Sequence, residues 1–147
     1  MPQFARPDND FNNPDSWQDQ AAGGVNIFQS IDETAFSDAD YIRSPLAPTA
    51  DIYVARLSDV EDPQSSAGHI FRTRYAKDAA AGSQIDLVVQ LRQGYVSEGT
   101  PGTLIVARTF TNISEVFTTD AYTLSGAEAD AITNYNDLFI RYNANQV

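Results

Sequence analysis

The clearest strand of the sequence is QIDLVVQLRQ (84–93), because apolar side chains occupy every second position along it. These apolar positions are Ile85, Leu87, Val89 and Leu91. Successive side chains of a β-strand point to opposite faces, so one face of this segment is apolar and the other carries mainly Gln, Asp and Arg. The pattern predicts a strand that lies half-buried on a hydrophobic core.

Further strand-length segments flank this one and are separated by turn residues. The predicted strands are 25–31, 41–43, 52–57, 69–76, 103–110, 116–124 and 138–142. One short helix is predicted before the last strand, where Ser125 and Glu128 have the spacing of a capping box. Strands at this spacing without intervening helices are typical of an antiparallel sandwich or jelly roll. We therefore expect an all-β domain over residues 25–147.

Residues 1–24 differ from the rest, with three Pro, three Asn and four Asp. Such a composition disfavours a helix or a central strand. We expect an extended N-terminal arm with three aromatic anchors, Phe4, Phe11 and Trp17. Two alternatives stay open: a strap folded over its own domain, or an arm that reaches a neighbouring subunit.

The charge balance restricts the partners. Twenty acidic residues against nine basic ones give a net charge of −11, which repels phosphate backbones and anionic lipid. Nucleic acid and membrane are therefore not expected as partners, and no apolar run approaches the roughly 18 residues of a membrane span. The chain has no cysteine, which excludes disulfides and thiolate metal sites.

Eight of the nine basic residues are Arg, the cation that is enriched at protein interfaces. Strand alternation places several of them on a solvent face. The members of this predicted Arg face are Arg56, Arg72, Arg74 and Arg92. They either pair with acids of their own chain or receive carboxylates from a neighbouring subunit.

Catalytic patterns are weak, and we expect no enzyme. His69 is the only histidine, and no G-x-S-x-G elbow accompanies it as a nucleophile. With twenty acids, pairs of carboxylates suited to glycoside hydrolysis arise by chance.

Cofactors are not expected, with calcium as a weak candidate. The acidic residues Asp32, Glu33, Asp38 and Asp40 fall within nine positions. Calcium binds six to eight oxygen ligands, but the spacing is not that of an EF-hand loop. Turns in which Asp bonds its own backbone explain the cluster equally well. Aromatic candidates for stacking on a glycan are Trp17, Tyr41, Tyr53, Tyr95 and Tyr135.

Three blocks, IDETAFSDADYI (31–42), LSDVEDPQSSAGHIFRTRYAK (57–77) and YTLSGAEADAITNYNDLFIRYN (122–143), follow ARPDND (5–10) in this order. Together they resemble a jelly-roll module of tailed-bacteriophage virion proteins, notably head-decoration and minor tail components. The resemblance implies an antiparallel jelly-roll β-sandwich and supplies no catalytic residues.

The resemblance also implies a location and partners. It favours a capsid decoration (cement) protein that is made in the host cytoplasm and binds the major capsid protein on the outside of the head as a homo-oligomer. The alternative is a tail or receptor-proximal module that binds host-surface glycan.

Overall fold

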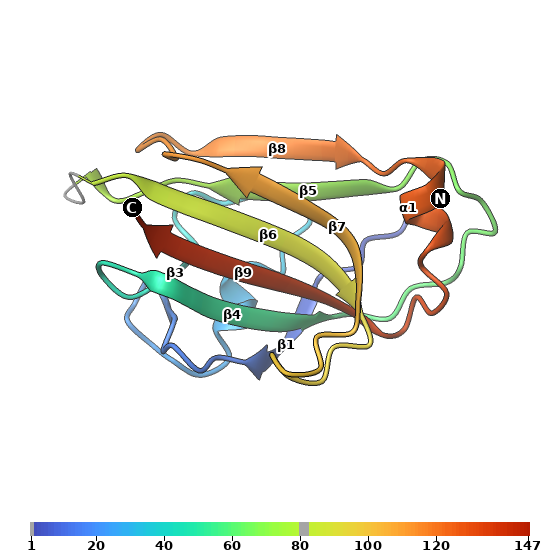
Figure 1. Cartoon of the computed structure of the whole chain (residues 1–147), viewed down its shortest axis with the longest axis horizontal. Helices are drawn as coiled ribbons and strands as arrows, with labels where there is room; N and C mark the ends of the chain where they lie inside the picture. The colour runs from blue at the N-terminus through green and yellow to red at the C-terminus, as the bar shows by residue number, and fades with distance from the viewer. Residues whose placement is uncertain (1, 80–82) are drawn as a thin grey trace.

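A computed structural model describes residues 2–79 and 83–147, and over this part the chain is an antiparallel all-β sandwich with one short α-helix (Figure 1). Its strands are β1 (Pro7–Asn12), β2 (Gln18–Asp19), β3 (Ile42–Arg43), β4 (Thr49–Leu57), β5 (Ile70–Tyr75), β6 (Ile85–Gln93), β7 (Thr103–Phe110), β8 (Thr118–Thr123) and β9 (Leu138–Gln146). The helical elements are the 3₁₀ turn η1 (Ile27–Ser30) and α1 (Gly126–Asp130). The predicted fold class is confirmed.

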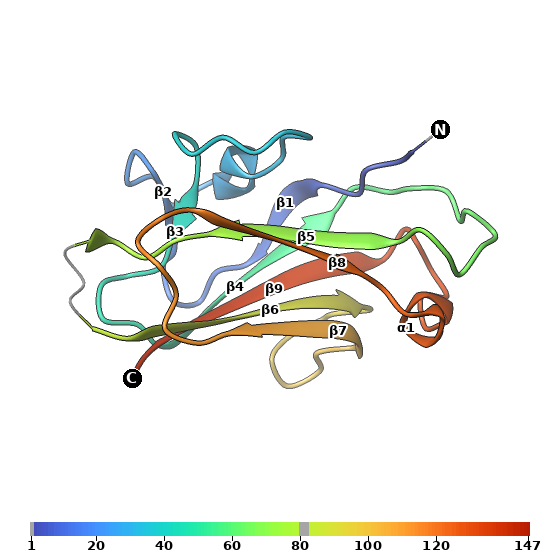
Figure 2. The same cartoon turned by 90° about the horizontal axis from the view of Figure 1, so that it is seen from above.

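The strands form two unequal layers. Five of them make one sheet in the order β1-β4-β9-β6-β7, and β5 pairs with β8 in a second sheet. Figure 2 shows the layers from the side, with β5 and β8 in one half and β6, β7 and β9 in the other. The small pair β2-β3 and the turn η1 lie in the same half as β5 (Figure 2). The chain passes between the sheets from β4 to β5, β5 to β6, β7 to β8 and β8 to β9, which joins the layers tightly.

The core lies between the layers and is built by period-two alternation. In β6 the four apolar positions of the 84–93 stretch are all buried. The central strand β9 adds Leu138, Ile140 and Ala144 from the same sheet, and Phe71 points inward from β5. Complete burial of one such large apolar side chain stabilises the fold by about 1.5–3 kcal/mol.

The helix α1 begins as the sequence predicts. Ser125 Oγ accepts the amide of Glu128, and the Glu128 carboxylate accepts the amide of Ser125 over 2.7 Å. These two bonds satisfy donors that the first helical turn leaves unpaired. Leu124 before the helix and Ile132 after it are buried, so the cap fixes the connection between β8 and β9 onto the core. No helix within the described residues is long and apolar enough to cross a membrane.

The strand predicted over 25–31 is wrong, because η1 occupies this region. Asn26 has a left-handed backbone with a φ of 56°. The Asp10 carboxylate then accepts the amides of Ile27 and Phe28 over 3.0 and 2.9 Å. A carboxylate from β1 therefore starts the turn, and an extended chain would lose both bonds.

The first 24 residues are packed onto the sandwich over much of their length. Residues 7–12 pair antiparallel with β4 and form an edge strand of the larger sheet. Trp17 is 5% exposed, and its ring lies 6.1 Å from the rings of both Tyr53 and Tyr142. These contacts hold the extended segment on the rest of the chain at β1 and Trp17.

Candidate functional site

The second layer covers only part of the larger sheet, and its two long sides are built differently. On the side of β7 and β8, Arg108 donates to Asp120 over 2.8 Å and lies 4.3 Å from the Tyr122 ring. Close by, the rings of Tyr75 and Phe110 approach to 4.2 Å. Side chains from both layers therefore close this side.

The opposite side is open. A groove of about 490 Å³ runs between β5 and the chain segments 2–7 and 30–37. Its floor includes Leu91, Ile140 and Tyr142, which belong to the larger sheet. The volume falls within the range of roughly 300–1,000 Å³ that is usual for ligand pockets.

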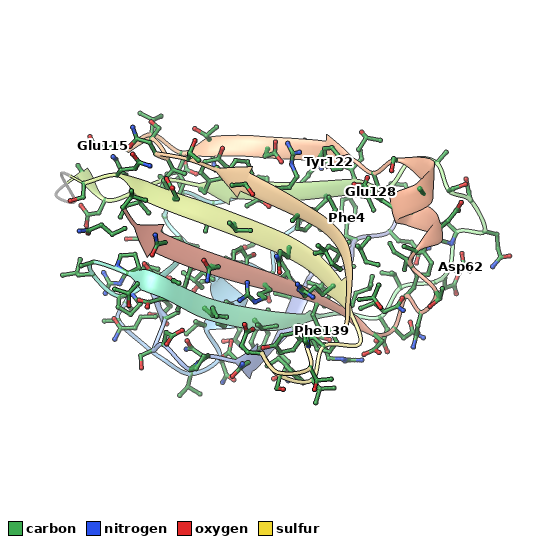
Figure 3. All side chains as sticks on the ribbon, viewed as in Figure 1. Phe4, Asp62, Glu115, Tyr122, Glu128 and Phe139 are labelled. Carbon is green, nitrogen blue, oxygen red and sulfur yellow. The ribbon has the colours of Figure 1, made fainter. Side chains whose placement is uncertain are left out.

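Exposed apolar side chains line this groove. Phe4, Phe36 and Ile70 are 48%, 50% and 51% exposed, and all three line it. Figure 3 marks Phe4 toward the end of the molecule that carries α1. Exposed apolar residues that occur singly are ordinary, whereas a contiguous group marks a docking surface. The three side chains come from three separate parts of the chain and meet only in the folded protein.

Polar atoms without partners also lie in the groove wall. Thr73 is 5% exposed, and its Oγ1 has no hydrogen-bond partner within the described residues. His69 Nε2 and the Tyr135 hydroxyl share a hydrogen bond of 2.7 Å, while His69 Nδ1 is buried without a partner in the same part of the chain. A buried polar atom without a partner is costly, so both atoms are local weak points in the packing of this wall.

In the part of the chain that the structure describes, one edge of β5 has no neighbouring strand. Within the described residues β5 pairs with β8 alone, and the Leu124 amide donates to the His69 carbonyl over 2.9 Å. Bonded and non-bonded pairs alternate along an antiparallel ladder. The backbone amides and carbonyls of Ile70, Arg72 and Arg74 therefore point away from β8, toward the open side of the sandwich.

The predicted Arg face is divided between the two sheets. Arg72 and Arg74 lie on β5 and line the groove. Arg74 forks onto both oxygens of Asp38, and this pairing lowers the pKa of the Asp38 carboxyl. Arg72 is exposed and has no ion pair or side-chain hydrogen bond in the described part of the chain.

The other two arginines lie on the outer face of the larger sheet. Arg56 in β4 donates to Asp59 over 3.0 Å, and Arg92 in β6 donates to Gln90 over 2.7 Å. Both of these pairings are made within the chain. Because the four arginines are divided between two sheets, they form no single stripe on the described surface.

The acidic residues predicted as weak calcium ligands take separate roles. Asp38 holds Arg74, whereas Glu33 lines the groove. Burial raises the pKa of Glu33, and a hydrogen bond with Asp40 and the negative charges of Asp40 and Asp32 add to the rise. Among residues 2–79 and 83–147, no three His, Asp or Glu side chains are grouped as metal ligands.

A second aromatic cluster lies on the outer face of the larger sheet. Phe11 packs edge-on against Phe139 at 4.8 Å and Tyr95 at 5.8 Å; Figure 3 marks Phe139. The Tyr95 hydroxyl donates to Glu98, and Arg141 bonds the same carboxylate over 2.7 Å, which lowers the pKa of Glu98. Phe11 is therefore in contact with its own chain and still 40% exposed.

Three of the five aromatic residues considered for glycan stacking are buried. Trp17, Tyr53 and Tyr95 are 5%, 0% and 2% exposed. Stacking on a sugar requires an accessible ring face, so these three cannot serve. Tyr41 and Tyr135 are half-buried.

Comparison with protein-family models, with curated proteins and with solved structures gave no match for this chain.

Sequence reasoning found part of the groove. It named Phe4, Glu33, Arg72 and Arg74, all of which line the groove. It missed Phe36 and the apolar outward position Ile70. The alternation of 69–76 places Ile70 on the same face as the two arginines, but no local pattern reveals which strand edge stays unpaired.

Proposed function

We propose that this chain is a structural protein of a phage particle, a decoration protein that docks on the outside of the assembled head through the open side of its sandwich. The observation that carries the proposal is the groove lined by Phe4, Phe36 and Ile70 beside an unpaired strand edge. A protein that leaves both features uncovered exposes apolar surface and a template for strand pairing. A partner that covers this side removes both liabilities.

The sequence resemblance supports the same part of the molecule. Two of the three blocks that resemble phage virion proteins, 31–42 and 57–77, supply most of the groove walls. The third block, 122–143, contributes Ile140 and Tyr142 to the floor. The residues that carry the resemblance and the residues that form the groove therefore coincide to a large extent.

The proposed mechanism is mass action on the shell. A protein that binds only the assembled lattice of major capsid protein stabilises it by RT ln(1 + [L]/Kd), about 2.7 kcal/mol per site at a hundredfold excess over Kd. Symmetric copies would sum this effect over the shell. No catalytic step is assigned to the protein.

Copy number per particle tests the location. Quantitative mass spectrometry of purified phage should find the protein in hundreds of copies if it decorates the shell. A handful of copies, or recovery only with isolated tails, would contradict a decoration role and favour the tail module.

Reconstitution tests the docking side. Undecorated shells are mixed with the wild type, with Phe36→Ser, and with Leu46→Ser as a control, since Leu46 is 90% exposed and outside the groove. We expect Phe36→Ser to weaken binding by about tenfold or more, as is usual for a buried aromatic anchor. Equal occupancy for both variants would show that the groove is not the docking side.

A further inference from the structure

We infer that the partner adds an extended strand to the free edge of β5, with apolar side chains pointing into the groove and a carboxylate opposite Arg72. The inference rests on the proposed docking role and names the chemistry of the segment that docks. It applies to a partner different from this chain.

The dimensions of the two layers support an added strand. Neighbouring strands lie about 4.8 Å apart, so the pair β5-β8 cannot span a sheet of five strands. The elements η1, β2 and β3 lie in the same half as β5 (Figure 2). The groove lies between β5 and segments 2–7 and 30–37, where a third strand of the smaller sheet would run.

The free edge and the groove match the two requirements of strand addition. The outward amides and carbonyls of Ile70, Arg72 and Arg74 provide main-chain bonds for affinity. Every second side chain of the incoming strand points down onto Leu91 and Ile140, which gives specificity for apolar residues.

Local charge selects an acidic residue on the outer face. The outward positions of the β5-β8 sheet are Ile70, Arg72, Arg74, Thr119, Ala121 and Thr123, none of them acidic. Asp38 already pairs with Arg74, so Arg72 is the unpaired charge among these outward positions of the described residues. Interactions between exposed charges fade over about 8 Å at physiological salt, so the charge of Arg72 acts most strongly on a residue directly across the β5 edge, whereas Glu33 and Glu61 act on the groove that they line. A carboxylate directly across from Arg72 is therefore favoured.

The same charge argues against a second copy of this chain. Two copies could pair their β5 edges antiparallel about a twofold axis. In the registers that pair the most residues, Arg72 would lie opposite Arg72 or Arg74 of the other copy. Like charges directly opposite each other destabilise a ladder. The edge is therefore better suited to a different protein with an acidic, apolar segment.

Synthetic peptides test the recognition directly. The probes are capped peptides of about nine residues, a usual strand length, with Val, Leu or Phe at alternate positions and Asp at the central outward position. A matched set carries Lys in place of Asp. We expect the Asp set to bind about tenfold more tightly, and amide hydrogen exchange of Ile70, Arg72 and Arg74 to slow by about tenfold or more on binding.

Three variants distinguish main-chain pairing at the β5 edge from the charge of Arg72. Arg72→Pro removes an outward amide while sparing the bonds to β8, and should abolish binding. Ala121→Pro is the control, because Ala121 is the partner of Arg72 on β8 and its amide faces the other edge. Arg72→Gln should keep peptide binding and lose the preference for Asp over Lys. Thermal unfolding confirms that each variant is folded.

Several outcomes would overturn the inference. They are no binding by either peptide set, unprotected β5 amides, equal binding of both sets, unchanged binding by Arg72→Pro, or concentration-dependent dimers that protect these same amides. Shells that bind Arg72→Pro as well as the wild type would reject strand addition and leave the decoration role intact. Specific peptide addition with no shell binding would reject the decoration role alone.

Discussion

The two long sides of the sandwich are made from the same two layers, but side chains close the gap between the layers on one side only. At β7 and β8, the Arg108–Asp120 pair and the tilted ring contact between Tyr75 and Phe110 join the layers. At β5, the layers separate over a groove and leave a strand edge without a partner among the described residues. The closed side shows that this chain can seal its own sandwich with side chains. The open side is therefore where a partner has the most to contribute.

The largest expected effect concerns the segment that borders the open side. Trp17→Ala removes a ring buried against Tyr53 and Tyr142, and should lower the free energy of unfolding by about 3–5 kcal/mol because a cavity remains. Urea unfolding measures this loss. Phe4→Ala, at a 48% exposed position, should cost less than about 1 kcal/mol. A small loss for Trp17→Ala would mean that the N-terminal segment detaches as a free arm.

The layered fold was predictable because alternation is a local property of the chain. Stretch 84–93 has an apolar residue at every second position, and the capping box at Ser125 lies within four residues. The strand predicted over 25–31 failed because its conformation depends on Asp10, which lies far away in the sequence. Strands β4 and β9 extend beyond their predicted ends because neighbouring strands continue the ladder past the apolar residues.

The groove was predictable only in parts. Arg72 and Phe4 were singled out as contact residues, and both line it. Their convergence depends on which strands pair, and the sequence does not specify that β5 has a neighbour on one side only. Trp17 carried the same aromatic signal as Phe4, but burial separates the two residues. Spacing alone cannot distinguish an anchor for a partner from an anchor for the chain's own core.

A second prediction weakens the closed side. Arg108→Ala removes the bonds to Asp120 and the contact with Tyr122, and should lower the free energy of unfolding by about 1–2 kcal/mol. Arg72→Ala is the control, because Arg72 is exposed and has no ion pair among the described residues, and this change should cost less than about 0.5 kcal/mol. A double-mutant cycle of Arg108→Ala with Asp120→Ala isolates the pair. Equal losses for the two arginines would contradict a special role for the closed side.

A third prediction concerns Thr73 Oγ1, the hydroxyl oxygen near the groove that has no hydrogen-bond partner among the described residues. Thr73→Val replaces the unpartnered Oγ1 with a methyl group of similar size, and should raise the free energy of unfolding by about 0.5–1 kcal/mol. Ser30→Ala is the control with the opposite sign. Ser30 Oγ donates to Gln20 over 2.9 Å, so this change should cost about 1 kcal/mol. Calorimetry compares the free energies of unfolding of the two variants. A lower value for Thr73→Val than for the wild type would mean that the Thr73 hydroxyl makes a hydrogen bond.

The smallest effect is a difference in pH dependence between the groove and the outer face of the larger sheet. Burial and Asp40 raise the pKa of Glu33, so the folded protein binds this proton more tightly than the unfolded chain does. Stability from this group is therefore present at low pH and is lost as the pH rises through the raised pKa. Glu33→Gln should stabilise the protein at neutral pH by less than about 0.5 kcal/mol, and the gain should vanish below the ordinary glutamate pKa.

Glu98 on the outer face of the larger sheet should give the opposite pH dependence of stability. The Arg141 guanidinium lowers the pKa of Glu98, so its stabilisation is present above the ordinary glutamate pKa and is lost as the pH falls through the lowered value. Glu98→Gln should therefore destabilise the protein at neutral pH and have little effect in strong acid. Urea unfolding of both variants from pH 3 to pH 8 distinguishes the two carboxylates. If a partner strand covers the groove, binding should further raise the pKa of Glu33 by burying it, while Glu98 should keep its titration unchanged.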